Sequence, residues 1–157
     1  MSFSSFSCII CFSTTSIISI SSSSNSNSSN SNSSPSVSWS RDANMAFTAL
    51  DNANFQCEND TKHETFISAR TGNQFVEAHH LIPMEYQGDF LISIDVPENI
   101  ISLCPNCHRA FHNSVVSNQE ILISKFFESR SPLLKERDIS ITKKKIFEYY
   151  KTTPNSV

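Results

Sequence analysis

The sequence predicts a small α+β domain in which two strands pair and a helix follows directly. Phe75 to Leu81 has the length and the aromatic or β-branched content of a strand. Ile100 to Leu103 is a second short apolar run, which we expect to return beside the first. Pro105 suits the first turn of a helix, and we expect that helix to run to Asn113. The predicted order is therefore strand, loop, strand and helix.

The folded domain is expected over residues 41–152 of the 157. The first 40 residues contain no charged side chain, and half of them are Ser. Such a segment lacks the apolar surface that would offset the entropy of ordering, so residues 1–40 are predicted to be disordered, and residues 153–157 form a tail. The apolar islands near the start are too short to span a bilayer, and no Lys or Arg precedes them. We expect neither a membrane segment nor an export signal.

Further helices are expected on both sides of the strand pair. The first runs from Asp42 to Asn54, with Ser40 or Asp42 as its N-cap. Residues 57–74 are polar and are expected to form a loop or an irregular hairpin. Phe90 to Ile94 would make a short strand within the loop that joins the two main strands.

The C-terminal part is expected to be helical. Ser117 and Glu120 fit a capping box that opens a helix to about Ser129. Pro132 is expected to restart a short helical piece, and Thr142 to cap a last helix. The expected inward side chains of these helices are Ile121, Leu122, Phe126, Ile146, Phe147 and Tyr150.

The cysteines and histidines are concentrated in one part of the chain. All five histidines and three of the five cysteines fall between residues 57 and 112. An odd number of cysteines argues against a secreted disulfide scaffold and favours a reducing interior, so we expect a cytoplasmic protein. The concentration favours metal binding over an ordinary core with a few histidines.

Thiolates favour zinc in closed tetrahedral sites. Cys104 and Cys107, in a Cys-x-x-Cys pair, supply half of such a site, and Cys57 is the third ligand that we expect. His63 is the preferred fourth ligand, with Asp60 as the alternative. A zinc bound there would pin the loop after the first helix to the start of the helix at Pro105, which a small domain often needs.

The remaining histidines suit a second, open metal site. His108 and His112 are four residues apart on the expected helix, so they share one face and can grip one ion. Period two places His79 and His80 on opposite sides of their strand, so these two cannot do the same job. One of them would complete a three-nitrogen cluster for a divalent ion, and the other would take a proton from an attacking water. Asn99 would orient that base through its side-chain amide, or would only make the turn before the second strand.

The charge distribution separates an acidic centre from a basic tail. Residues 57–112 hold 3 basic and 8 acidic side chains, whereas residues 113–157 hold 8 basic and 5 acidic ones. This arrangement is compatible with a cation site beside a surface that meets phosphate. Lys143, Lys144 and Lys145 form either a phosphate-contacting patch or a solvated helix face, and Arg109 points either to phosphate or to solvent.

Three runs of this sequence, EAHHLIP, DVPEN and SLCPNCHRAFH, resemble the HNH endonucleases of the ββα-metal fold. The resemblance covers about residues 41–152 and is strongest to the zinc-stapled branch found in restriction-type enzymes of bacteria and phages. It implies that His80 is the general base, that His79 binds the catalytic metal, and that Asn99 is the central Asn of the motif. The other positions that match the family are His108 and His112 of the closing helix and the zinc ligands Cys57, Cys104 and Cys107. The family commonly has a second Cys-x-x-Cys where this chain has Cys57 alone, which leaves the fourth zinc ligand open.

The resemblance implies a metal-dependent endonuclease, of restriction or phage type, that hydrolyses the phosphodiester bonds of DNA. Zn²⁺ would be structural, and Mg²⁺, Mn²⁺ or another divalent ion would be catalytic. Sequence-specific cutting would need a homodimer, a partner chain for recognition, or the loop from Ile82 to Glu98. The alternative is a catalytically silent zinc-binding module for nucleic acid or protein. Such a module would not require the full set of His79, His80, Asn99, His108 and His112.

Overall fold

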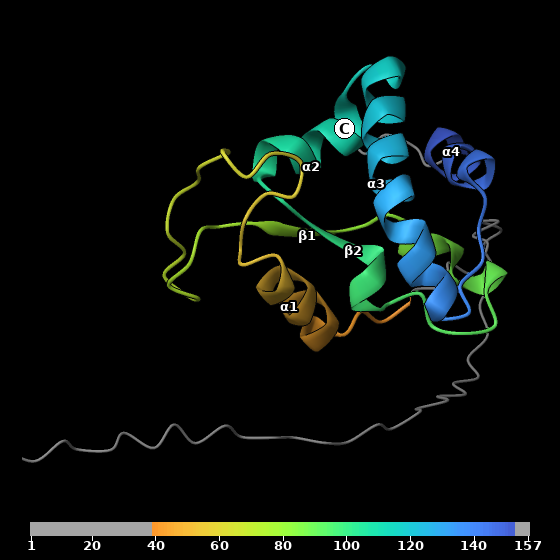
Figure 1. The fold of residues 1–157 in the computed structure, drawn as a ribbon, viewed down its shortest axis with the longest axis horizontal. Coiled ribbons are helices and arrows are strands. Elements are labelled where there is room, and N and C mark those ends of the chain that lie inside the picture. Colours follow the sequence, from red (N-terminus) through yellow and green to blue (C-terminus); the bar gives the residue numbers. More distant parts are fainter. Residues whose placement is uncertain (1–38, 153–157) are drawn as a thin grey trace, which may run out of the picture. The chain divides into compact units, whose positions relative to one another are not determined.

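The computed structural model describes residues 39–152 of the chain. Its elements follow the order α1 (Ala43–Asn52), β1 (Glu77–His80), η1 (Met84–Asp89), η2 (Pro97–Asn99), β2 (Ile100–Leu103), α2 (Pro105–Asn113), α3 (Val116–Glu136) and α4 (Lys143–Thr152), where η marks a 3₁₀-helix. A β-hairpin followed by a helix forms the centre of a mixed α/β unit, as the sequence predicts (Figure 1). The expected disorder of residues 1–38 and the tail of residues 153–157 lie outside the described residues.

The two strands pair antiparallel, with His79 opposite Ile101 and His80 opposite Ile100. All four residues of β2 are buried, whereas β1 is mostly half-buried. Strand β2 is covered because α1 and α2 both contact the hairpin, from opposite sides in the view of Figure 1. Strand β1 is shorter than expected, since Phe75 and Val76 lie before it.

The helix that follows the hairpin begins and ends where the sequence predicts. Pro105 occupies the first helical position, where a missing backbone N–H removes no helix bond. The sulfur of Cys104 accepts a hydrogen bond from the Cys107 N–H and so acts as the N-cap. Helix α1 is capped by Asp42, whose carboxylate accepts from the Asn44 N–H at 2.8 Å.

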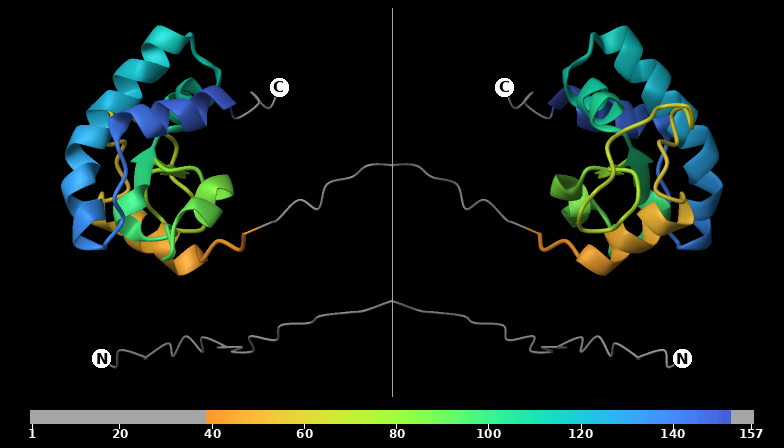
Figure 2. Two further views of the ribbon diagram at one scale, coloured as in Figure 1. Left: turned by 90° about the vertical axis from the view of Figure 1, so that its right-hand side faces the viewer. Right: turned by 90° about the vertical axis from the view of Figure 1, so that its left-hand side faces the viewer.

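Helices α3 and α4 close the other side of the unit. Helix α3 contacts α2, α4 and η2, and both views of Figure 2 show it running along one side. The N-cap of α4 is Thr142, as predicted, and its hydroxyl accepts from the Lys145 N–H. The largest fully buried side chains are Leu81, Ile82, Ile94, Asn99, Ile100, Ile101, Leu103, Phe111, Ile123, Leu134, Ile139 and Ile146.

Three predictions for α3 are wrong. The helix begins at Val116, so Ser117 lies inside the first turn and the expected capping box does not form. Pro132 does not restart a helix but lies within one helix of 21 residues. Burial explains this, because Phe126 before the proline and Leu134 after it are both anchored in the core. Ile121 is 67% exposed, and Ile123 takes the buried position instead.

The loop between the strands also differs from the prediction. Residues Phe90 to Ile94 form no strand; the loop instead contains the 3₁₀-helices η1 and η2. The Gln87 side chain explains the compact shape, because its amide donates to the Ile92 carbonyl and its oxygen accepts from the Ile94 N–H, both at 2.8 Å. A side chain therefore satisfies backbone groups that a partner strand would otherwise have satisfied.

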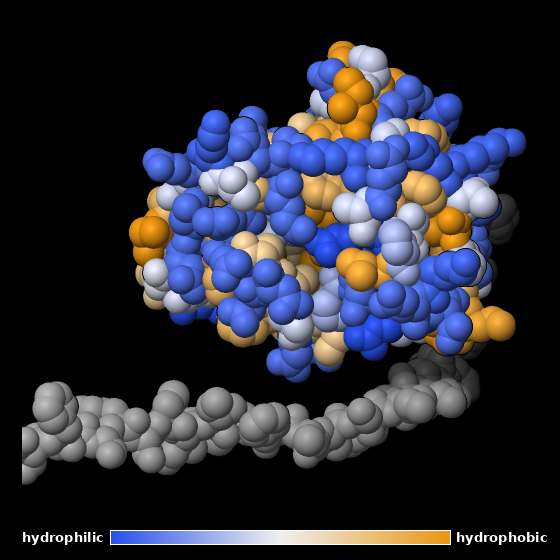
Figure 3. Space-filling model, viewed as in Figure 1, coloured by the Kyte–Doolittle hydropathy of each residue, from blue (hydrophilic) through white to orange (hydrophobic). Residues whose placement is uncertain are grey.

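The surface carries few apolar groups on the face that Figure 3 shows, where hydrophilic side chains dominate and hydrophobic ones form small separate groups. Among residues 39–152, no helix has the length and apolarity needed to cross a membrane.

Candidate metal and catalytic site

Cys57, His63, Cys104 and Cys107, the cysteine cluster, converge at the start of α2. One ligand atom from each lies within 4.8 Å of those of the other three. The His63 Nδ1 atom is 3.6 Å from the Cys104 sulfur and 3.4 Å from the Cys107 sulfur. A tetrahedral zinc with ordinary bond lengths would set such atoms about 3.6 Å apart. The donor set and its spacing therefore fit a structural zinc.

The geometry groups His63, rather than Asp60, with the three thiols. The Asp60 carboxylate faces the other ring nitrogen of His63, with Oδ2 3.9 Å from Nε2. A carboxylate on the far nitrogen can hold the ring while Nδ1 faces the sulfurs, as the outer partners of metal-bound histidines commonly do. This arrangement favours His63 over Asp60 as the fourth ligand.

The pKa values of two of these thiols are shifted in opposite directions. Burial raises the pKa of the Cys57 thiol, but hydrogen bonds from the Cys104 and Asp60 backbone and from His63 outweigh burial and lower the pKa to about 7. Burial raises the pKa of Cys107 to about 12, and the neighbouring thiols add to the rise even though Asn59 donates to its sulfur at 3.3 Å. Two adjacent thiolates therefore repel each other, and a divalent cation between them removes that cost.

The segment that carries Cys57 is bonded to β2. Glu58 donates from its N–H to the Ser102 carbonyl, and its carboxylate accepts from the Ser102 N–H at 2.7 Å. The Ser102 hydroxyl donates to the Gln56 carbonyl. Arg130 of α3 binds the other oxygen of Glu58 at 2.5 Å. These contacts hold the segment that carries Cys57 beside the strand that leads to Cys104.

A second group, the histidine cluster of His79, His108 and His112, lies between β1 and α2. Its ligand atoms also lie within 4.8 Å of one another. The ring centroids are 5.0 to 5.2 Å apart, and each pair of rings meets edge to face. His108 and His112 are one helical turn apart, as predicted, and His79 completes the triangle from the strand. Three convergent nitrogens on one side of an ion leave other coordination positions open.

Burial favours the neutral, metal-binding form of two members of this cluster, His79 and His112. Burial, followed by the nearby His108 and His112, lowers the pKa of His79 well below its ordinary value. Burial also lowers the pKa of His112, with His108 and Arg109 contributing. The His108 Nδ1 atom is 2.6 Å from the Glu77 carboxylate. Neutral imidazoles are the metal-binding form, and a carboxylate behind one of them fixes its ring.

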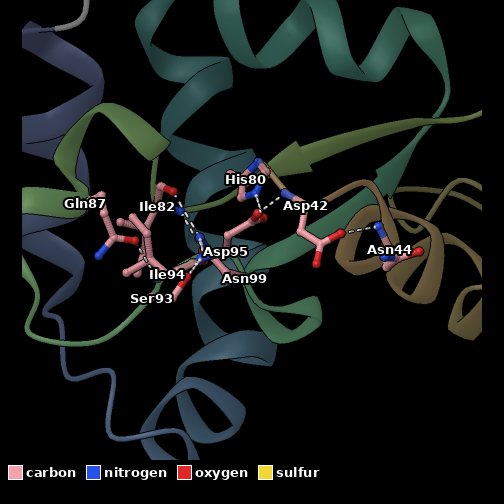
Figure 4. A network of polar contacts seen from close by, with 9 residues as sticks. All are labelled: Asp42, Asn44, His80, Ile82, Gln87, Ser93, Ile94, Asp95 and Asn99. Atoms are coloured by element: carbon pink, nitrogen blue, oxygen red, sulfur yellow. Dashed lines mark hydrogen bonds and ion pairs between the residues drawn. The ribbon is translucent and has the colours of Figure 1, made fainter. Parts of the chain in front are cut away.

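His80 points away from the histidine cluster, as the strand period predicts, and meets Asp95. Its Nε2 atom is 2.9 Å from one Asp95 oxygen, while the other Asp95 oxygen accepts from the Asp42 N–H at 2.5 Å (Figure 4). Burial lowers the pKa of His80, although Asp95 acts in the opposite direction. His80 is therefore a neutral imidazole whose Nε2–H is held by a carboxylate, which leaves Nδ1 free to accept a proton.

Asp95 is the functional candidate that the sequence reading missed. It begins the run DVPEN, from which only Asn99 was selected. Its carboxylate is buried, and a buried carboxylate needs a partner. One signal was available in the sequence: an acidic residue directly after the apolar Leu91 to Ile94 stretch, close to the paired histidines.

The predicted contact between the Asn99 amide and His80 is absent. Asn99 is fully buried, and its amide donates to the Ile82 and Ile94 carbonyls and accepts from the Ile82 N–H, at 2.8 to 3.0 Å. These bonds, visible in Figure 4, use both amide donors and one acceptor position of the side chain to close the loop between the strands. Asn99 therefore holds the loop between the strands, and Asp95 makes the direct contact with His80.

Two of the basic residues expected to contact nucleic acid lie close to carboxylates of this chain. Lys143 pairs with Glu128 at 3.0 Å, and Lys145 lies 3.8 Å from Asp89. Arg109 is exposed on α2. Both predictions for these residues, phosphate contact and solvation, stay predictions.

Comparison with known proteins agrees with this geometry. Residues 46–117 match a family model described as HNH endonuclease. The chain is also similar to the type IV methyl-directed restriction enzyme EcoKMcrA of Escherichia coli (strain K12), with 36% identity over 74 residues. That alignment covers 47% of this chain and 24% of the relative, so the chain spans about a quarter of that enzyme. Both clusters, His80 and Asp95 all fall within the matched segment.

We predict that Cys107→Ser abolishes zinc binding and cooperative thermal unfolding, because the cluster loses a thiolate and the domain loses its staple. Asp60→Asn is the matched control: it keeps all four ligand atoms and is expected to retain zinc. Zinc content by atomic absorption and unfolding by circular dichroism check both. Zinc bound to Cys107→Ser at the wild-type level would exclude the cysteine cluster as the site.

We predict that Asn99→Ala lowers the free energy of unfolding by about 3 kcal/mol or more, because three buried backbone groups lose their partner. Equilibrium unfolding in urea, with zinc bound, measures the change. Asn73→Ala serves as control, since its side chain makes only an exposed contact with Thr71. Equal stabilities of the two variants would contradict the structural role of Asn99.

Proposed function

We propose that the protein is a metal-dependent endonuclease that hydrolyses phosphodiester bonds in DNA, and the match of residues 46–117 to the HNH endonuclease model supports this proposal. The observation that carries the proposal is the convergence of three histidine nitrogens from β1 and α2, next in the chain to a base held by Asp95. A purely structural zinc module would need the cysteine cluster but neither of these features.

Each residue then has a distinct task. His79, His108 and His112 would hold a divalent ion such as Mg²⁺ or Mn²⁺, which would supply positive charge to neutralise the phosphate and stabilise the leaving oxygen. His80 accepts, at Nδ1, the proton of the water whose oxygen bonds to phosphorus as the leaving oxygen departs. Asp95 keeps the N–H of His80 on Nε2 and stabilises the imidazolium that forms.

Phosphate binding is assigned by charge. Arg109 is exposed on the helix that carries His108 and His112, where its guanidinium adds positive charge beside the histidine cluster. Lys143, Lys144 and Lys145 at the start of α4 are proposed to contact the DNA backbone more distantly. Such contacts add affinity without sequence preference and weaken with salt.

We propose that the residues that select the DNA target are not the residues that cleave it. The enzyme EcoKMcrA is named as methyl-directed, but the present chain covers only 24% of it. We therefore propose that a restriction-type specificity, where it exists, comes from the loop between Ile82 and Glu98, from a second copy or from a partner chain. Within this loop Leu91 is fully exposed beside Ile92, so the loop presents an apolar tip near Asp95.

We predict that zinc-loaded wild-type protein nicks or cuts supercoiled plasmid when Mg²⁺ or Mn²⁺ is added and that His80→Ala slows this reaction by about 100-fold or more. His112→Ala is expected to lose both cleavage and Mn²⁺ binding. Agarose gels of samples taken over time measure the rates of plasmid cleavage. A reaction with chelator is the metal-free control. Full activity of His80→Ala would remove it as the base. If folded, zinc-loaded wild type leaves DNA intact, the chain is a silent zinc module or lacks a partner.

We predict that Asp95→Asn slows cleavage by between about 10-fold and 100-fold with unchanged DNA binding, because an amide neither fixes the His80 tautomer nor stabilises its cation. Asp89→Asn is the control from the same loop, since the Asp89 carboxylate meets Tyr149 and Lys145. Single-turnover cleavage and a filter-binding isotherm separate rate from affinity. A rate for Asp95→Asn equal to that of the control would contradict the role of Asp95.

A further inference from the structure

Helix α4 lies beyond the segment that matches the family model, yet it reaches the histidine cluster. Tyr150 projects from this helix to β1, and its hydroxyl oxygen is 2.8 Å from the His79 Nε2 atom. The same oxygen is 3.3 Å from the His80 carbonyl and 3.2 Å from the Leu81 carbonyl. The Tyr150 ring also packs near Phe111 of α2, which limits its rotation. One hydroxyl group therefore meets a ring nitrogen and two carbonyl oxygens.

The hydrogen-bond roles follow from what each atom can do. The two carbonyl oxygens can only accept, so the single Tyr150 proton satisfies both of them at once when it points between them. With the proton in that position, the oxygen of Tyr150 offers a lone pair to His79, which donates from Nε2. This arrangement places the N–H of His79 on Nε2 and leaves the lone pair on Nδ1.

The same logic applies to the neighbouring ligand. His108 contacts the Glu77 carboxylate through Nδ1, and a carboxylate oxygen only accepts, so the N–H of His108 lies on Nδ1. The lone pair of His108 is therefore on Nε2. Outer partners of this kind commonly set which nitrogen of a histidine binds a metal.

We infer that Tyr150 is a positioning residue of the metal site, which holds His79 in the tautomer that presents Nδ1 to the ion. Helix α4 is then part of the site and not only a cover over the core. The inference rests on the proposed function, because it assigns a role toward the same divalent ion. It adds a residue from outside the matched segment.

The test compares Tyr150→Phe with Tyr149→Phe. The first change removes the hydroxyl but keeps the ring against Phe111. The second removes a hydroxyl from the next position of the same helix, where it donates to Asp89 at 2.7 Å and not to a histidine. Both variants are studied as full chains with zinc bound.

The first readout is the tautomer of His79, observed by long-range ¹⁵N–¹H NMR correlation without added divalent ion. We expect the Nε2–H form in wild type and in Tyr149→Phe, and a mixture or the Nδ1–H form in Tyr150→Phe. An Nδ1–H tautomer in the wild type overturns the inference, whatever the variants do. This measurement holds even where Tyr150→Phe fails to fold.

The second readout is Mn²⁺ affinity by isothermal titration calorimetry in the absence of DNA. We expect binding about 10-fold to 100-fold weaker in Tyr150→Phe and unchanged in Tyr149→Phe. Equal affinities of Tyr150→Phe and wild type overturn the inference even if the protein is a nuclease. A wild type that binds Mn²⁺ but leaves plasmid intact contradicts the proposed function and leaves the role of Tyr150 standing.

Discussion

The register in which β1 pairs with β2 determines which of the paired histidines faces α2. It sets His79 opposite Ile101 and His80 opposite Ile100, so the two histidines leave opposite sides of the strand. A slip by one residue would exchange their sides and separate His79 from α2. The register is fixed at one end by the Leu81 N–H, which bonds the Asn99 carbonyl, and by the buried Asn99 amide beside it.

The two clusters attach different parts of the chain to helix α2. The cysteine cluster joins the segment after α1 to the first turn of α2, whereas the histidine cluster joins the middle of α2 to β1. Helix α2 therefore carries ligands of both kinds, and fixing its first turn also fixes the orientation of His108 and His112. A domain with only a modest core gains rigidity at the site from such a link.

Local rules explain which parts of the fold were predictable. Strand alternation separated His79 from His80, and helical spacing joined His108 with His112, because both periods are properties of the local backbone. Cys104, Cys107 and Cys57 could be grouped from ligand chemistry alone. Pro105 and Asp42 marked helix starts through their own capping preferences.

The errors occurred where distant contacts override local preference. Buried Phe126 and Leu134 carry α3 through Pro132, which local rules treat as a break. The apolar run from Phe90 to Ile94 favours a strand by local preference. The Gln87 side chain bonds the backbone of Ile92 and Ile94 and holds this segment in a compact loop instead. Asp95 and Tyr150 contact histidines that are 15 and 71 residues away in the sequence, and local spacing does not predict contacts at such a distance.

We propose that one fold holds two metal sites with separate tasks. Anomalous diffraction from crystals of zinc-loaded protein soaked in Mn²⁺ tests this proposal, with data at the absorption edge of each metal. We expect zinc bound by Cys57, His63, Cys104 and Cys107 and manganese bound by His79, His108 and His112. Zinc and manganese in the same cluster, or manganese bound away from the three histidines, would contradict it.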